Sequence, residues 1–174
     1  MDRKLISFFK KLIGCKLCDI IYQPTAGILS DDNMFVFNFK GENDFLSLHV
    51  FAFARIRKRE NILVMSSDEF FDENYNKITD YSNGAFLEGT LLKKRIESIK
   101  ESSKEMTVKN VMLKSCGDLY VYFSNDMVLE IEIDCHYQDY EYYRLIDVNN
   151  ENNYIVLQFK DEKVTFDYYW GREN

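Results

Sequence analysis

The sequence is poor in proline, alanine and histidine, with a single Pro and only two His among its 174 residues. No apolar stretch approaches the roughly 20 residues that a membrane-spanning helix needs, so we expect no membrane span. The chain also lacks any recognisable catalytic or cofactor-binding motif, internal repeat or low-complexity linker. These absences favour a non-enzymatic protein without a cofactor, folded as one domain over residues 1–174.

What the chain does contain is typical of a folded protein rich in strands. Hydrophobic residues make up 46% and charged residues 29%, which separates the chain from disordered sequences. Aromatic residues reach 16%, through 14 Phe and 12 Tyr, and these side chains favour β-strands.

The formal net charge of −7 is unevenly distributed. Residues 1–16 are basic, whereas residues 117–174 hold thirteen acidic against four basic side chains. An acidic field repels the phosphates of nucleic acids and attracts cationic partners. We therefore expect a protein partner, and no nucleic acid.

The stretch from Asp118 to Asp134 alternates polar and apolar residues on both sides of a short turn at 124–126. This pattern predicts an antiparallel hairpin with one buried face. Because successive strand side chains point to opposite faces, the apolar set would lie together in the core: Leu119, Val121, Phe123, Met127, Leu129, Ile131 and Ile133. The opposite face would then be acidic and aromatic.

The remaining elements follow from the same patterns. Apolar residues at helical spacing predict helices over 4–13 and 87–100. The nearly continuous apolar run 45–55 predicts a central strand covered on both faces. Further strands are expected over 18–22, 33–40, 62–65, 107–115, 153–160 and 163–169. The fold class is therefore α+β: a mainly antiparallel sheet with an N-terminal helix and one mid-chain helix packed against it.

The beginning of the chain differs from a signal peptide. Lys10 and Lys11 interrupt its apolar run, and no small-residue cleavage site follows. A docked amphipathic helix is the preferred interpretation, with a membrane-surface helix as the alternative. The expected location is cytoplasmic, where the four cysteines would stay reduced.

Two other candidate sites stay open as alternatives. Cys15 and Cys18 form a C-x-x-C pair that could act as a thiol or metal sensor. The pair follows a helix end and has no second closely spaced pair, so we expect free thiols and no metal. His49 and Arg55 could line a pocket for a small ligand or a reaction.

The leading candidate is a protein-binding surface on the acidic, tyrosine-rich face. Tyrosine supplies a large contact area at low entropic cost, and acidic groups steer a basic partner. The alternative is an ordinary solvated sheet face. The partner-binding residues would be Tyr120, Tyr122, Glu130, Glu132, Asp134, Asp139, Glu141 and Tyr142.

Several short segments carry a resemblance when taken together: Leu12–Gly14 with Leu17, Met34–Phe37 after Ala26, Ser47–Val50 before Arg55 and Ile56, Gly117–Leu119, Leu129–Ile131 and Glu141–Leu145. They resemble an uncharacterised family of small bacterial cytosolic proteins. In that family Trp is common where this chain has Ala54 and Tyr143. The family has no established activity, so the resemblance implies no catalytic residue.

The size, charge and expected architecture also resemble those of immunity proteins of polymorphic or contact-dependent toxin systems. This second resemblance implies a binding protein that neutralises a cognate bacterial toxin domain, for example a basic nuclease.

Overall fold

The computed structural model describes residues 3–23, 34–78, 89–102, 106–133, 140–150, 153–161 and 163–169. The helices are α1 (Arg3–Lys10) and α2 (Leu91–Ser102), with short 3-10 helices η1 (Ser66–Phe70) and η3 (Val148–Asn150). The strands are β1 (Lys16–Gln23), β2 (Met34–Lys40), β3 (Phe45–Val50), β4 (Phe53–Lys58), β5 (Asn61–Met65), β6 (Val108–Leu113), β7 (Leu119–Phe123), β8 (Met127–Glu132), β9 (Glu141–Asp147), β10 (Tyr154–Lys160) and β11 (Lys163–Tyr169).

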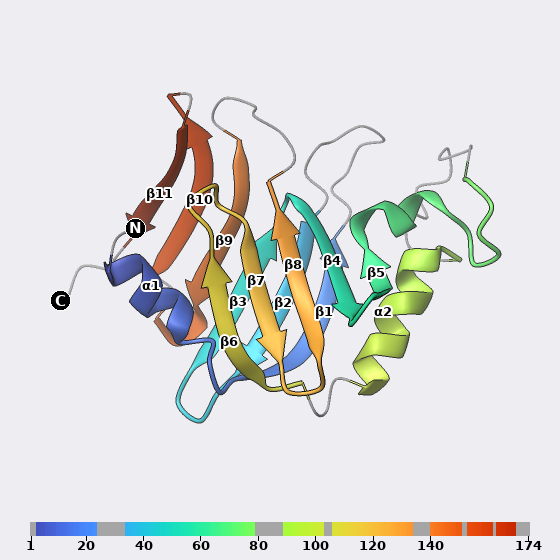
Figure 1. Ribbon diagram of the computed structural model, residues 1–174, viewed down its shortest axis with the longest axis horizontal. Coiled ribbons are helices and arrows are strands. Elements are labelled where there is room, and N and C mark those ends of the chain that lie inside the picture. Colours follow the sequence, from blue (N-terminus) through green and yellow to red (C-terminus); the bar gives the residue numbers. More distant parts are fainter. Residues whose placement is uncertain are drawn as a thin grey trace.

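These strands form two antiparallel sheets (Figure 1). The six-stranded sheet has the order β1-β2-β3-β9-β10-β11, and the five-stranded sheet has the order β5-β4-β8-β7-β6. The predicted fold class, α+β with a mainly antiparallel arrangement and two helices, is confirmed. The prediction named one sheet, whereas the strands are divided between two.

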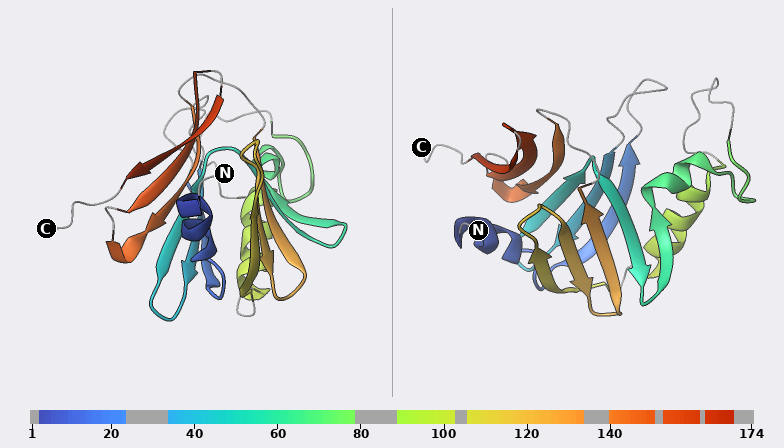
Figure 2. Two further views of the ribbon diagram at one scale, coloured as in Figure 1. Left: turned by 60° about the vertical axis from the view of Figure 1, so that its left-hand side comes forward. Right: turned by 45° about the horizontal axis from the view of Figure 1, so that its top comes forward.

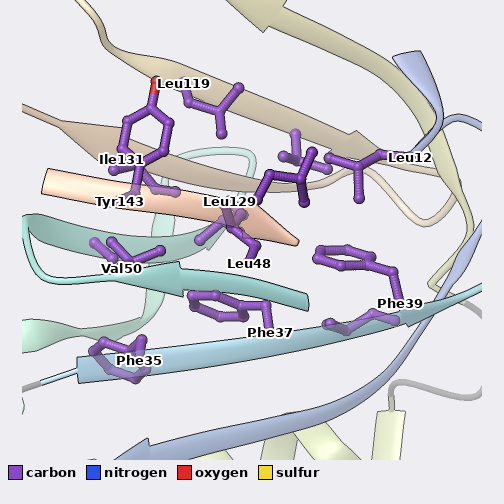
Figure 3. Packing of buried hydrophobic residues seen from close by; sticks show 14 of the residues in the cluster. Leu12, Phe35, Phe37, Phe39, Leu48, Val50, Leu119, Leu129, Ile131 and Tyr143 are labelled. Atoms are coloured by element: carbon purple, nitrogen blue, oxygen red, sulfur yellow. The ribbon is translucent and has the colours of Figure 1, made fainter. Parts of the chain in front are cut away.

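The core lies between the inner faces of the two sheets. Phe35, Phe37 and Phe39 project from β2 toward Leu119 of β7 and Leu129 of β8 (Figure 3). All five side chains are buried. Burial of such apolar surface is the main favourable contribution to folding.

The β7–β8 hairpin follows the predicted register. Leu119 pairs with Ile131 and Val121 pairs with Leu129, and these four side chains are fully buried. The turn contains Asp126 at a φ of 65°, a conformation that Asp tolerates better than most residues. The predicted apolar face is therefore confirmed, with its last member, Ile133, only partly buried.

Tyr143 of β9 connects the two sheets. Its hydroxyl donates a hydrogen bond of 2.7 Å to the backbone carbonyl of Gly117, in the turn before β7. Gly117 has a φ of +99°, and a Cβ there would lie 3.1 Å from side-chain atoms of Leu157 and Val164. Only glycine suits both this backbone conformation and the space beside it.

The helices lie at opposite ends of the molecule (Figures 1 and 2). The apolar stripe of α1 buries Leu5, Phe8 and Phe9, and the Phe9 ring lies edge-on to that of Tyr143. At the other end α2 packs against η1, β5 and β1. In the described part of the chain, the helices are too short and too polar to cross a membrane.

Both predicted helices are shorter or shifted in the structure. The first helix ends at Lys10, and a turn leads through Gly14 at a φ of +88°. Ile13, the last residue of the predicted helix, lies beyond the helix end and is exposed. The second helix begins at Leu91 instead of residue 87, which lies outside the described residues.

The predicted strand 45–55 is wrong as a single element. The chain leaves the six-stranded sheet after Val50 and enters the five-stranded sheet at Phe53. Between them, the N–H groups of Phe51 and Ala52 both donate to the carbonyl oxygen of Tyr142. The run is continuously apolar because it crosses from one sheet to the other beside the shared core.

Strand β9 was not predicted, although it lies inside the six-stranded sheet between β3 and β10. Its adjacent residues Tyr142 and Tyr143 are both fully buried, so the segment lacks the simple alternation of a half-exposed strand.

Candidate functional site

The outer face of the five-stranded sheet brings together several predicted site residues and two arginines. Glu130 faces outward because its neighbours Leu129 and Ile131 lie in the core. Its cross-strand neighbours are Arg55 of β4 and Tyr120 of β7. We call this surface the arginine face and define it by Arg55, Arg57, Met112, Tyr120, Tyr122, Glu130 and Glu132.

Glu130 accepts hydrogen bonds from both arginines. Arg55 Nε lies 2.5 Å from Glu130 Oε2, and Arg57 Nε lies 2.5 Å from Oε1. Arg55 Nη2 also donates to Glu132 Oε1 at 3.0 Å. Arg57 Nη1 donates to the backbone carbonyl of Arg59 at 2.7 Å. Each guanidinium is therefore held at two of its nitrogens.

These contacts keep the carboxylate of Glu130 ionised. Burial acts to raise the pKa of Glu130, but the hydrogen bonds from Arg57 and Arg55 outweigh it and the pKa lies below its ordinary value. The hydrogen bond to Glu130 in turn raises the pKa of Arg55. The charges on Glu130 are thus compensated within the protein.

The arginine face is not the acidic surface that the sequence predicted. The side chain of Glu130 is only 4% exposed, whereas those of Arg55 and Arg57 are 29% and 34% exposed. The arginines come from β4, which pairs with β8 although it is distant from it in sequence. They cover the carboxylate of Glu130. The face holds two cationic and two anionic side chains, Arg55 and Arg57 against Glu130 and Glu132, and Glu130 lies beneath the two guanidiniums.

Tyr120 and Tyr122 lie on this face as predicted, and both are partly exposed. The ammonium group of Lys114 lies 4.6 Å from the centroid of the Tyr120 ring, and it donates to the Tyr120 hydroxyl at 2.9 Å. Met112 is the cross-strand neighbour of Tyr120 and is exposed. The face therefore carries aromatic and apolar surface beside its charges.

The other predicted residues that the structure describes do not join this face. Glu141 and Tyr142 lie on β9, in the other sheet. Tyr142 is fully buried, so the expectation that it contacts a partner is wrong. Glu141 accepts two hydrogen bonds from Arg144, three residues along. Asp134 and Asp139 lie outside the described residues.

His49 and Arg55 do not line a common pocket. His49 points outward from the six-stranded sheet, because Leu48 and Val50 are buried, and Arg55 points outward from the five-stranded sheet. The two side chains therefore lie on different outer faces. This placement removes the geometric basis for the small-ligand site that the sequence suggested.

His49 belongs to a neutral hydrogen-bond chain. Ser47 Oγ donates to Asn38 Oδ1 at 2.8 Å, and His49 Nε2 lies 3.0 Å from Ser47 Oγ. A hydroxyl has one proton to donate, so Nε2 of His49 is assigned as the donor to Ser47. His49 in this arrangement does not act as a base toward Ser47. Burial lowers the pKa of His49, and the charge of Arg144 lowers it further.

The cysteine pair is separated by its local structure. Cys15 is buried and its thiol donates to the carbonyl of Lys11, whereas Cys18 is exposed and donates to the carbonyl of Asn38. Burial raises the pKa of both thiols, and the charges of Asp44 and Asp19 raise them further. Among the described residues, no group of ligating side chains has the geometry to hold a metal ion.

The basic cluster that contains Arg55 and Arg57 is evident in the sequence, but its place on this face is not. Ala54 and Ile56 alternate with the two arginines and mark them as outward-facing. The pairing of β4 with β8 was not visible in the sequence, since 73 to 77 residues separate the charged partners.

Comparisons with protein-family models, with curated proteins and with solved structures find no match to this chain. The resemblances stated above therefore stay predictions.

Proposed function

We propose that this protein is a binding protein without catalytic activity, which neutralises a cognate toxin by docking its arginine face onto it. The observation that carries the binding role is the composition and rigidity of that face. The toxin-neutralising role is supported by the resemblance to immunity proteins in size and net charge.

The composition of the arginine face is that of a protein interface. Protein interfaces are enriched in Tyr, Met and Arg and depleted in Lys and Glu. Here Tyr120 and Tyr122 stand on β7, separated from the arginines of β4 by β8, and Met112 lies beside Tyr120. Arg and Tyr are also among the residues whose truncation costs most binding energy in known complexes.

The rigidity of the face supports the same proposal. The residues project from paired strands whose inner faces form the core, and both guanidiniums are already held by Glu130. Side chains that are ordered before association lose less entropy when they bind.

The alternative functions have less support in the geometry. A small-ligand site would need His49 and Arg55 on one surface, and they lie on two. A thiol sensor would need thiols of low pKa, and both Cys15 and Cys18 have raised pKa values.

The experiment compares how much partner protein is captured by two variants, each of which replaces two tyrosines. The test variant is Tyr120→Ala with Tyr122→Ala on the arginine face. The control is Tyr154→Ala with Tyr169→Ala, a stacked pair on the outer side of the other sheet, with ring centroids 4.4 Å apart. We expect the test variant to lose the captured protein and the control to keep it.

A growth assay then tests the toxin role. The captured protein should inhibit growth when it is expressed alone, and co-expression of the wild-type chain should restore growth. A captured protein that has no effect on growth would contradict neutralisation. Equal loss in both tyrosine variants would contradict the arginine face as the binding surface.

A further inference from the structure

We infer that the partner meets the arginine face with carboxylate groups, and not with the cationic surface that the net charge of the chain suggests. This inference rests on the proposed function and names the chemistry of its partner. It follows from the exposure of the charged groups of the face. Glu130 is almost completely covered, and the guanidiniums that cover it are about one-third exposed. Glu132 is 35% exposed and is bonded to Arg55, so among the residues that define this face the guanidinium of Arg57 has no exposed acidic partner.

The two guanidiniums have unused N–H donors that could bind an anion. A guanidinium has five N–H donors. In Arg55 the bonds to Glu130 and Glu132 use Nε and Nη2, and in Arg57 the bonds to Glu130 and Arg59 use Nε and Nη1. Both groups therefore have donor capacity beyond their internal bonds, in orientations that are already held. Arginine forks bind carboxylates through paired N–H donors.

The spacing of the arginines limits the arrangement of the partner. Arg55 and Arg57 are two positions apart on β4, so they project from the same face about 7 Å from each other. Carboxylates at alternate positions of an extended acidic segment have the same spacing. Tyr120, Tyr122 and Met112 lie across β8 from the arginines and provide apolar surface for other side chains of the partner.

A protein fits this face better than a nucleic acid. The chain has a net charge of −7, and Glu132 remains 35% exposed beside Arg55. A continuous phosphate backbone would meet repulsion from these negative charges along its whole length. A protein can instead place a few carboxylates at the arginines and apolar surface elsewhere.

The first test uses three probes in turn: a peptide of alternating Glu and Thr, its counterpart of alternating Lys and Thr, and single-stranded oligothymidine. Binding is followed by NMR through the backbone amide signals of β4 and β8 and the Nε–H signals of Arg55 and Arg57. We expect the glutamate peptide to shift these signals. The inference is overturned if the lysine peptide or the oligonucleotide shifts them instead, or if no probe does.

The second test measures whether removing a charge from the face strengthens or weakens binding of the glutamate peptide. Glu132→Gln should strengthen binding of the glutamate peptide about two- to fivefold, because it removes an exposed like charge. Arg57→Gln should weaken it about tenfold, and Arg57→Lys, which keeps the charge, should restore part of the loss. The opposite signs would overturn the inference, as would no change in any variant. Thermal melting of each variant shows whether the fold is kept.

Failure of this inference can be told apart from failure of the proposed function. If the glutamate peptide does not bind but capture is lost in the Tyr120→Ala, Tyr122→Ala variant, the arginine face is the interface and only the partner's charge is wrong. If capture is unaffected by that variant, the proposed function itself fails.

Discussion

The outer faces of the two sheets differ in how their partly buried polar side chains are paired. On the six-stranded sheet, Asn38, Ser47 and His49 form a neutral chain within neighbouring strands β2 and β3. On the five-stranded sheet, the charged partners are 73 to 77 residues apart in sequence. Neutral networks of the first kind depend on local register, whereas the arginine face depends on strands brought together only by the fold.

This difference affects stability. A buried charged group that loses its partner destabilises the fold more than a buried neutral group does. A neutral hydrogen-bonded group that loses its partner costs about 1–3 kcal/mol. A buried charge that loses its partner costs more, although solvent screening reduces the effect where the partner is partly exposed. The arginine face should therefore be more sensitive to substitution, pH and salt than the neutral chain.

The largest expected effect is that of Glu130→Ala. Removal of the shared carboxylate leaves Arg55 and Arg57 without their common acceptor, and we expect the free energy of unfolding to fall by about 2 kcal/mol. Chemical denaturation measures this value. Glu132→Ala is the matched control and should cost less than about 1 kcal/mol, because its side chain is more exposed. Equal losses in the two variants would contradict the central role of Glu130.

The second effect is the response of the arginine face to acid. The folded-state pKa of Glu130 lies below its ordinary value, so its stabilising contribution is complete above the unfolded-state pKa of about 4.3. That contribution is lost as the pH falls through the lower folded-state pKa. We expect the stability difference between wild type and Glu130→Gln to shrink over this range, as measured by denaturation at a series of pH values. A constant difference would show that the carboxylate's charge contributes nothing.

A smaller effect is expected from Ser47→Ala in the neutral chain. The substitution removes the acceptor of His49 Nε2 and the donor to Asn38 Oδ1, and we expect a loss of about 1 kcal/mol. This loss should not change between low and high salt, whereas the loss for Glu130→Ala should decrease as salt is added. Similar salt dependence in both variants would remove the distinction between the two faces.

The smallest effect is the titration of His49. Its folded-state pKa is lowered, first by burial and then by Arg144. The contribution of neutral His49 is therefore present above the ordinary pKa of about 6.5 and is lost as the pH falls through the folded-state value. NMR titration of its ring signals should show a lowered pKa, and Arg144→Gln should raise that pKa. The His49→Gln variant identifies the signal, and an unchanged pKa in Arg144→Gln would contradict the contribution of Arg144.

Elements with simple periodicity were predictable from the sequence. The hairpin of β7 and β8, the alternation of β2 and the apolar stripe of α1 all have one side in the core. Strand β9 and the break near Phe51 were not predictable in the same way. In both places consecutive residues are apolar. The periodicity of the sequence then cannot show where a strand begins or ends, or where the chain passes from one sheet to the other.

The candidate site was only half predictable for a related reason. Alternation showed that Tyr120, Tyr122 and Glu130 face away from the core. It could not show that β4 lies beside β8, because strand order depends on contacts distant in sequence. It also could not separate Tyr142 from the exposed tyrosines, since its burial follows from the central position of β9.

The amino-acid sequence by itself determined the fold class, the two faces of the hairpin and, over the residues that the structure describes, the absence of a long apolar helix. Each of these depends on the order of polar and apolar residues along one segment. Tertiary structure alone decided the charge of the arginine face. Pairing of β4 with β8 brings the guanidiniums of Arg55 and Arg57 over the carboxylate of Glu130. The guanidiniums are therefore more exposed to solvent than the carboxylate.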